Sequence, residues 1–224
     1  MTDDLKTVRK AITDGRIFLG IELGSTRIKS VLIDEDYKPV ASGGYGWENQ
    51  LENGIWTYNL EDAWIGLRAS FQDLNRAIEA KYGILLEKVG AIGISGMMVG
   101  YLVFDRENHQ LVPFRTWRNT ITEDASRRLT DLFKFNIPQR WSIAHLYQSM
   151  LNGESHVKDI AFLTTLAGYI HWQMTGEKVV ALGDASGILP VDQHTCDYDA
   201  RMVEQFNQLL PDFDISWKLR DILP

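Results

Sequence analysis

The segment 18–34 limits the folds open to this chain more than any other part of the sequence. It consists of two runs rich in isoleucine, leucine and valine on either side of the short turn Gly-Ser-Thr-Arg at residues 24–27. Alternating apolar and polar positions with many β-branched residues are typical of strands, and so short a turn joins antiparallel ones. A third run of this kind follows. The sequence therefore predicts a three-stranded meander with strands at 18–23, 28–34 and 38–44.

The turn of this hairpin carries groups that suit phosphate binding. Gly24 has no side chain to keep a ligand from the backbone, and successive N–H groups of such a turn can bind an anion. Ser25 and Thr26 add hydroxyls, and Lys29 adds a mobile positive charge. Glu22 lies in an apolar run, so we expect it to be buried, and its carboxylate suits a magnesium ion held through water. The alternative is an ordinary turn followed by a solvated lysine.

The rest of the chain alternates between helix and strand patterns. Asn59 is a typical N-cap and Gly83 a typical helix end, so a helix is expected between them. Its apolar face would consist of Trp64, Leu67, Phe71, Leu74 and Ile78. Strands are expected at 89–95, 101–104, 111–117 and 188–192, a short extended segment at 54–58, and helices at 3–14, 122–134, 142–151, 158–175 and 199–210. This order is typical of an α/β domain with a helical elaboration.

Composition excludes several classes of protein. A net charge of −7 over 224 residues argues against a nucleic-acid or acidic-membrane surface. The polar start of the chain is not a signal peptide, and no apolar stretch reaches the ~20 residues that span a bilayer. The single cysteine, Cys196, excludes an intrachain disulfide and fits a reducing compartment. We therefore expect a cytoplasmic protein with no nucleic-acid or membrane partner, and its helices leave room for a homodimer.

Four segments, in this order, carry a resemblance to a known family: residues 22–29, 91–100, 114–119 and 183–192. Together they resemble the N-terminal half of an FGGY-type, xylulokinase-like carbohydrate kinase. Residues 22–29 also resemble the phosphate hairpin of the actin/hexokinase-like ATPases, in which the acid is usually aspartate. The resemblance implies a ribonuclease-H-like α/β fold with a mixed sheet and a helical insertion. It also implies that residues 1–224 form the sugar-binding domain, with 1–15 as an N-terminal extension, and that the C-terminal nucleotide domain is absent from this chain.

The resemblance further implies roles for particular residues. The phosphates of ATP would be held by Gly24, Ser25, Thr26 and Lys29, and Mg²⁺ by Glu22. The sugar would be bound by Met98, Val99, Trp117, Arg118 and Asn119. No catalytic residue is assigned, because the aspartate that serves as base in the family would lie beyond Pro224. Asp184 belongs to an Asp-Ala-Ser-Gly loop that matches a family motif, and we expect it to be a helix N-cap or an Asx-turn residue.

Three of the sugar-site positions depart from the family pattern. Val99 stands where histidine often follows the methionine, and its apolar side chain removes a donor or acceptor for a sugar hydroxyl. Asn119 and Ile121 stand where a Trp-x-Asp-x-Arg pattern would place the acid and the arginine. The alternative interpretation is structural: methionines that fill the core, a core Trp117, and an Arg118 that pairs with a nearby acid on the surface.

The resemblance implies a function for the full-length protein. It would be an ATP-dependent carbohydrate kinase that transfers the γ-phosphate to a hydroxyl of a ketose, polyol or aldonate. This chain alone would be an inactive fragment, because phosphoryl transfer relies on a closed, dry cleft. A non-catalytic sugar-sensing or scaffold member of the same fold is the alternative, favoured by the departures from pattern. A carboxylate-metal nuclease would need clustered acids and a basic surface, and the sequence has neither.

Overall fold

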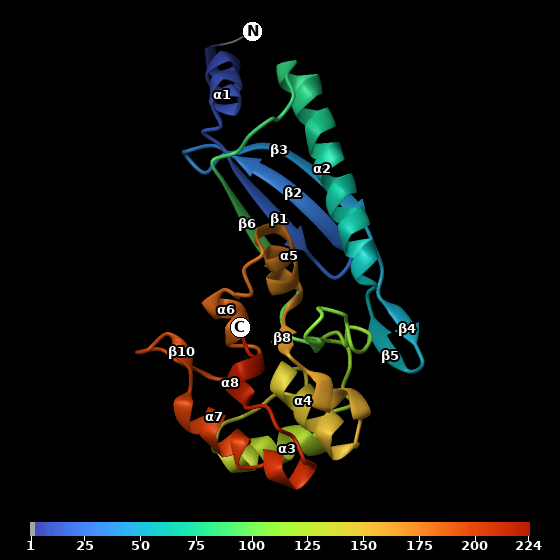
Figure 1. Ribbon diagram of the computed structural model, residues 1–224. Coiled ribbons are helices and arrows are strands. Elements are labelled where there is room, and N and C mark those ends of the chain that lie inside the picture. The colour runs from blue at the N-terminus through green and yellow to red at the C-terminus, as the bar shows by residue number, and fades with distance from the viewer. Residues whose placement is uncertain (1–2) are drawn as a thin grey trace. The chain divides into compact units, whose positions relative to one another are not determined.

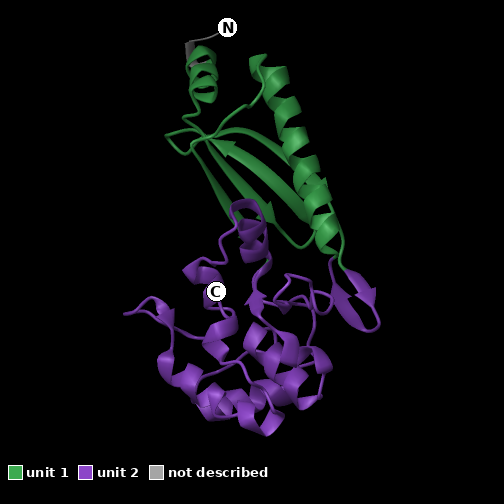
Figure 2. Ribbon diagram, viewed as in Figure 1, with its two compact units in different colours: residues 1–49, 59–97 green, residues 50–58, 98–224 purple. Residues whose placement is uncertain are grey.

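The computed structural model describes residues 3–224, which fall into two compact units (Figure 2). The first, here called the sheet unit, contains the residues up to Asn49 together with Asn59–Met97. The second, here called the helical unit, contains Gln50–Tyr58 and Met98–Pro224. The predicted meander and the long helix after Asn59 therefore share one unit, and most of the later helices share the other.

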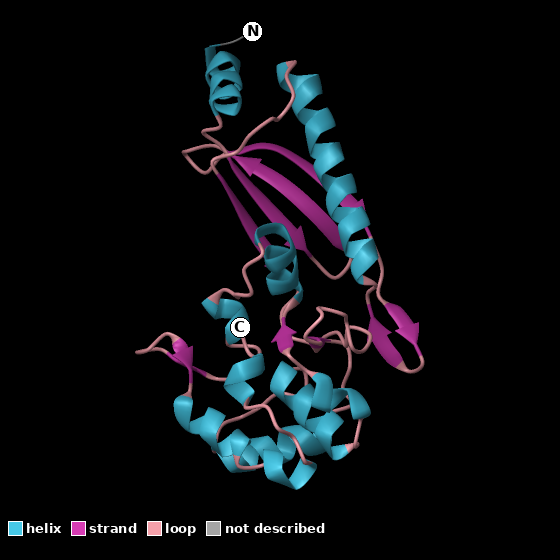
Figure 3. Cartoon of the chain, in the orientation of Figure 1, coloured by secondary structure: helices cyan, strands magenta, loops and turns pink. Residues whose placement is uncertain are grey.

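The sheet unit is built on a four-stranded sheet with the strand order β3-β2-β1-β6 (Figures 1 and 3). Its strands are β1 (Phe18–Leu23), β2 (Arg27–Ile33), β3 (Pro39–Gly46) and β6 (Ala91–Gly96). Strands β1, β2 and β3 pair antiparallel, whereas β6 pairs parallel with β1, so the sheet is mixed. The meander is confirmed to within two residues at each strand end. Helix α1 (Asp3–Asp14) precedes the sheet, also as predicted.

Helix α2 (Leu60–Tyr82) packs on one face of the sheet and has the predicted ends. The side-chain oxygen of Asn59 accepts a hydrogen bond from the Glu61 amide at 2.8 Å, and Gly83 ends the helix with φ 64°. The predicted contact face is only partly right. Its large side chains Trp64, Leu67 and Phe71 are half-buried. The buried positions are Leu60, Ala63, Gly66, Ser70, Leu74, Ile78 and Tyr82, and the small ones among them let the helix lie close to the sheet.

The helical unit contains three small two-stranded antiparallel sheets and most of the helices. The sheets pair β4 (Gln50–Glu52) with β5 (Ile55–Thr57), β7 (Leu102–Phe104) with β8 (Phe162–Thr164), and β9 (Val191–Asp192) with β10 (Asp197–Tyr198). The helices are α3 (Glu123–Phe133), α4 (Ser142–Leu151), α5 (Leu166–Thr175), α6 (Leu182–Ala185), α7 (Ala200–Asn207) and α8 (Leu219–Ile222), with 3₁₀ turns at Ser155–Asp159 and Leu210–Phe213. Fully buried Phe133, Leu146, Leu163 and Phe206 lie in its hydrophobic core.

Several predicted elements of the helical unit are wrong. The helix expected at 158–175 is instead the end of a 3₁₀ turn, strand β8 and helix α5. All three residues of β8 are buried, and so short an apolar run cannot be told from a helix by its periodicity. The strand expected at 111–117 is reduced to a single bridge between Arg115 and Tyr101. The strand expected at 188–192 and the helix expected at 199–210 form in shortened versions, β9 and α7.

Candidate functional site

The tip of the β1–β2 hairpin is held by a tryptophan. The amide of Gly24 donates to the carbonyl of Arg27 at 3.0 Å and closes the turn. Trp47 is buried; its indole Nε1 donates to the Gly24 carbonyl at 2.7 Å and its amide to the Thr26 carbonyl at 3.2 Å. Ser25 and Thr26 are exposed. Two of the tip's carbonyls are thus bonded to Trp47, while the side chains predicted to bind phosphate face solvent.

We expect the change Trp47→Phe to loosen this tip. The Gly24 carbonyl would lose its indole partner, which should lower the free energy of unfolding by about 1 kcal/mol. Hydrogen exchange should quicken at the Gly24 and Trp47 amides, with amides in the middle of α2 as the internal reference. Unchanged exchange at both amides would contradict the inferred role of Trp47.

Glu22 and Lys29 lie opposite each other on β1 and β2 and form an ion pair, with Lys29 Nζ 3.0 Å from Glu22 Oε2. The expectation that Glu22 is buried is wrong: its side chain is 52% exposed and that of Lys29 is 47% exposed. Strand alternation explains this, because Ile21 and Leu23 take the inward positions of β1. Exposed pairs of this kind contribute at most about 1 kcal/mol, so either partner can readily be drawn to a ligand.

A groove of about 380 Å³ runs along β2 and β3 beside the hairpin. Arg27 and Lys29 line it together with Asp73 of α2, whose carboxylate accepts a hydrogen bond from the Gly44 amide at 3.0 Å. Within residues 3–224, no three His, Cys, Asp or Glu side chains are placed to share a metal ion. A Mg²⁺ ion held by Glu22 would have that one protein carboxylate as ligand, with water and phosphate oxygens as the others.

The loop at residues 97–100, expected to touch sugar, has an unusual backbone. Val99 has φ 63° and Gly100 has φ 96°. Positive φ is rare for a β-branched residue, so neighbouring contacts must impose it. The Gly100 amide donates to the Arg140 carbonyl at 3.1 Å, and a side chain at Gly187 would come within 2.9 Å of Val99 Cγ1. This loop therefore packs closely against Gly187, which directly follows the C-cap of α6 and belongs to another segment of the family resemblance.

The exposure of Met98 and the partner of Arg118 argue against the structural interpretation of these two residues. Met98 is 52% exposed and so does not fill the core. The Arg118 guanidinium lies 3.9 Å from the ring centroid of Trp56, and within residues 3–224 it forms no ion pair with an acid. Trp117 is half-buried, with the Arg140 guanidinium 5.6 Å from its ring centroid. The neighbouring residues Trp117 and Arg118 thus each take part in a cation–π pair, Trp117 with Arg140 and Arg118 with Trp56.

Asn119 is only 2% exposed, and its amide is fully engaged. Its Oδ1 accepts from the Trp56 amide at 2.9 Å, and its Nδ2 donates to the carbonyls of Trp56 at 2.8 Å and Thr116 at 3.0 Å. In this conformation Asn119 ties residues 114–119 to strand β5. The aspartate expected at this position by resemblance would lack the donor for two of these three bonds.

Asp184 is neither an N-cap nor an Asx-turn residue, contrary to expectation. It lies inside α6, whose N-cap is Ala181, and its Oδ2 accepts a hydrogen bond from the Thr165 hydroxyl at 2.8 Å. Thr165 is itself the N-cap of α5 and accepts from the Gly168 amide at 3.0 Å. Burial raises the pKa of Asp184. The carboxylate therefore links the start of α5 to α6.

Comparison with known proteins identifies the family. The sequence model for the FGGY family of carbohydrate kinases, N-terminal domain, matches residues 17–212. The chain belongs to this family. A xylulose kinase of Lactococcus lactis subsp. lactis (strain IL1403) is 24% identical over 221 residues, which cover 87% of this chain and 40% of the relative. This FGGY chain thus spans less than half the length of the curated relative that it matches.

Solved structures of FGGY kinases share the fold. The xylulose kinase of Rhodospirillum rubrum has a TM-score of 0.75 at 19% identity, covering 93% of this chain and 43% of that one. For the glycerol kinase of Plasmodium falciparum with ADP the TM-score is 0.69 at 16% identity, covering 93% of this chain and 42% of that one. The expected ribonuclease-H-like (actin/hexokinase-like ATPase) fold with a mixed sheet is confirmed.

The predicted site residues of this FGGY chain divide between its two units. Glu22, Gly24, Ser25, Thr26 and Lys29 belong to the sheet unit, whereas Met98, Val99, Trp117, Arg118 and Asn119 belong to the helical unit. Sequence reasoning missed Trp47 and Trp56, which hold the two candidate segments. Both are bonded to residues far away in the chain, so no local pattern could have revealed them.

None of the helices in residues 3–224 has the length and hydropathy to cross a bilayer.

Proposed function

We propose that this chain is the sugar-binding half of an ATP-dependent carbohydrate kinase, which transfers the γ-phosphate to a hydroxyl of a ketose, polyol or aldonate. The observation that carries the proposal is the Gly24–Thr26 tip, with exposed Ser25 and Thr26, held by Trp47 in an FGGY-family domain. A C-terminal nucleotide domain would complete the enzyme and supply the catalytic base. The chain alone would be inactive, because phosphoryl transfer needs a closed, dry cleft.

In this proposal the hairpin binds the phosphates of ATP. The backbone of Gly24 and the hydroxyls of Ser25 and Thr26 would contact phosphate oxygens. Lys29 would exchange its exposed pair with Glu22 for a phosphate, which the weakness of that pair allows. Glu22 would then be released to hold Mg²⁺ through water. When bound, the metal would supply charge neutralisation at the transferred phosphate.

The sugar would lie against residues of the helical unit. Trp117 offers an apolar face to sugar C–H groups, and Met98 and Val99 offer apolar contacts without the imidazole expected from the family pattern. Arg118, stacked on Trp56, would bond a hydroxyl or a carboxylate. Asn119 would position this segment through its bonds to Trp56. These assignments make Arg118 the most direct test of the sugar site.

A thermal-shift screen tests the sugar site in this chain. D-Xylulose, xylitol and D-gluconate would represent the three sugar classes, with ATP and Mg²⁺ as a separate arm. A ligand at about 100 times its dissociation constant stabilises by about 2.7 kcal/mol, which should raise Tm by about 5–10 °C. Arg118→Gln should abolish the shift, and Arg106→Gln, which changes another exposed arginine of the same unit, should leave it intact. No shift with any sugar would contradict a formed sugar site.

The second candidate function is a non-catalytic sugar sensor or scaffold. It is favoured by Val99, which replaces an expected polar group, and by Asn119, whose amide is spent on Trp56. The reading frame after Pro224 separates the two: a further domain with a Gly-rich turn and an aspartate supports the kinase. The proposed setting is the cytoplasm, and light scattering of the purified protein would test the homodimer.

A further inference from the structure

Both segments proposed to contact sugar start from one pair of residues. Tyr101 and Arg115 form an isolated antiparallel bridge, in which the Tyr101 amide donates to the Arg115 carbonyl at 2.8 Å and the Arg115 amide donates back at 3.1 Å. Val99 and Gly100 directly precede Tyr101, and Trp117 is two residues after Arg115. Contacts that fix the Tyr101–Arg115 bridge therefore also fix the point where each sugar-site segment, 98–100 and 117–119, joins the rest of the unit.

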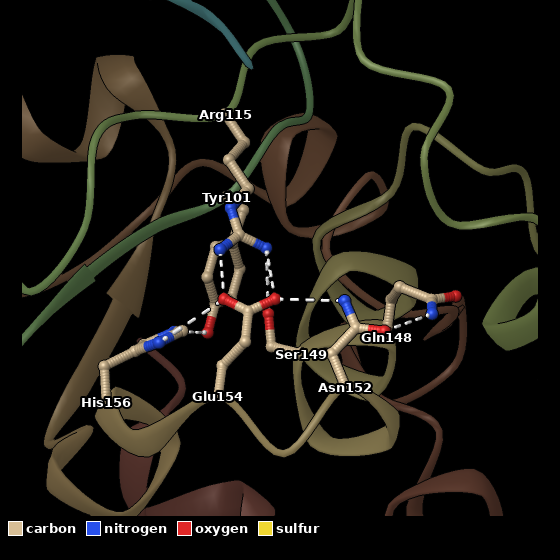
Figure 4. A network of polar contacts seen from close by, with 7 residues as sticks. All are labelled: Tyr101, Arg115, Gln148, Ser149, Asn152, Glu154 and His156. Atoms are coloured by element: carbon tan, nitrogen blue, oxygen red, sulfur yellow. Dashed lines mark hydrogen bonds and ion pairs between the residues drawn. The ribbon is translucent and has the colours of Figure 1, made fainter. Parts of the chain in front are cut away.

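The side chain of Arg115 is held by a half-buried carboxylate, that of Glu154 (Figure 4). Arg115 is 8% exposed, and its guanidinium binds Glu154 with both terminal nitrogens: Nη2 contacts Oε2, and Nη1 lies 3.3 Å from Oε1. Nη1 also donates to the Ser149 hydroxyl of α4 at 2.9 Å. Asn152 Nδ2 donates to Glu154 Oε1 at 3.2 Å and so orients the carboxylate. A bidentate pair of this kind fixes both direction and distance.

The side chain of Tyr101 joins the same network from the other side (Figure 4). Its hydroxyl lies 2.9 Å from His156 Nε2, and His156 Nδ1 lies 3.6 Å from Glu154 Oε2. The Arg115 guanidinium is 5.2 Å from the Tyr101 ring centroid. The two bridged residues are therefore joined through their backbones, and both side chains approach Glu154, Arg115 directly and Tyr101 by way of His156.

Stability alone does not explain an ion pair in which Arg115 is buried and Glu154 is half-buried. Removing two charges from water costs about as much as their attraction returns, and apolar residues of similar volume often serve as well. A bidentate pair instead specifies one geometry, because the planar guanidinium accepts a carboxylate in few orientations. The network therefore suits a site whose segments must be held in place.

We propose that Arg115 and Glu154 are positioning residues, whose ion pair sets the places of Val99 and Trp117 relative to each other. The effect on sugar binding rests on the proposed function, whereas the effect on Trp117 does not. Neither residue needs to touch the sugar. Loss of the pair should displace Trp117 and the Arg118–Trp56 stack even where the unit stays folded.

Indole N–H signals in ¹⁵N–¹H NMR spectra test the proposal on this chain. Glu154→Gln removes the charge at constant size. Arg115→Lys keeps the charge but loses the two-nitrogen contact of the guanidinium with the carboxylate. Asp214→Asn is the matched control, because it breaks the exposed Lys158–Asp214 pair of the same unit. Both network variants should shift or broaden the Trp117 and Trp56 signals by more than a line width, with Trp64 and Trp172 unmoved. Spectra of Trp117→Phe and Trp56→Phe would assign the two signals.

The outcomes are decisive in both directions. If Glu154→Gln lowers the urea midpoint but leaves the Trp117 and Trp56 signals in place, the pair only stabilises the unit and the proposal is overturned. Should that variant fail to fold, Ser149→Ala removes one bond to Arg115 and repeats the test more gently. D-Xylulose and D-gluconate titrations form a second arm, in which Glu154→Gln should weaken binding at least tenfold and Asp214→Asn should not. Absence of binding by the unmodified chain would contradict the proposed function but leave the indole result valid.

Discussion

Replacing Gly43 by alanine is expected to lower the free energy of unfolding of the sheet unit by about 3 kcal/mol or more. Gly43 lies on β3 directly under helix α2. A Cβ there would lie 2.2 Å from the Leu74 amide nitrogen and 2.2 Å from the Ser70 carbonyl oxygen. Both atoms belong to the backbone of α2, which cannot move aside as a flexible side chain can. The helix would have to lift from the sheet, so the cost exceeds that of ordinary overpacking.

Gly46 provides a matched control on the same strand. A Cβ at Gly46 would have nothing within 4 Å, so Gly46→Ala should change stability by no more than about 0.5 kcal/mol. Urea unfolding of both variants, followed by far-ultraviolet circular dichroism, measures the difference. Equal midpoints for the two variants would show that α2 does not approach β3 as closely as described.

Acidification from pH 7 to pH 5 is expected to lower the free energy of unfolding of the helical unit by about 2 kcal/mol. His145 is fully buried, and neither of its ring nitrogens has a hydrogen-bond partner among residues 3–224. Burial, assisted by the nearby Arg115 charge, lowers its pKa from 6.5 to about 3. Below pH 6.5 the His145 ring is therefore protonated in the unfolded chain but stays neutral in the folded chain. Stability must fall as the pH falls through this window.

Neighbouring groups shape the same profile. Burial also lowers the pKa of His156, which adds to the loss in the same direction. Burial alone would raise the pKa of Glu154, but the hydrogen bond and charge of Arg115, with smaller effects of Asn152 and His156, together outweigh burial and lower that pKa. Stability from the Glu154 carboxylate is therefore present above its unfolded pKa of 4.5 and declines only at lower pH. Between pH 7 and 5 the two histidines dominate.

The variant His145→Leu separates the two histidines. It replaces the buried ring by an apolar side chain of similar size, so the loss between pH 7 and 5 should shrink to the smaller share of His156. Denaturant titrations at both pH values, for the parent and the variant, give the four free energies needed. A variant with the same pH dependence as the parent would show that His145 is not the group responsible.

Elements with local signals could be predicted from the sequence. Asn59 and Gly83 mark the ends of α2 because capping depends on a few adjacent residues. The β1–β2 hairpin follows from alternation over residues 18–34 in the same way. Strand β8 is not predicted, because its residues fall within the helix expected at 158–175. They form a strand only by pairing with β7, about 60 residues earlier in the chain.

The candidate site shows the same division. Residues 24–26 and 117–119 could be selected from the sequence, because turn chemistry and family motifs are local. The residues that hold these segments in place could not be predicted from the sequence. Asn119 is bonded to Trp56, 63 residues away, and Arg115 to Glu154, 39 residues away. Glu22 was expected to be buried because its neighbours are apolar, but strand parity decides exposure and turns it outward.

The left-handed backbone at Val99 has a consequence for how this site can diversify. Its φ of 63° is one that valine disfavours, and the adjoining Gly100 amide is held by Arg140. The path of this loop is therefore dictated from outside, not by the residue that occupies it. A polar or apolar side chain can be exchanged at position 99 while the main chain keeps its course. Under the proposed sugar contact at position 99, substrate preference would drift by single changes there, without the evolution of a new loop.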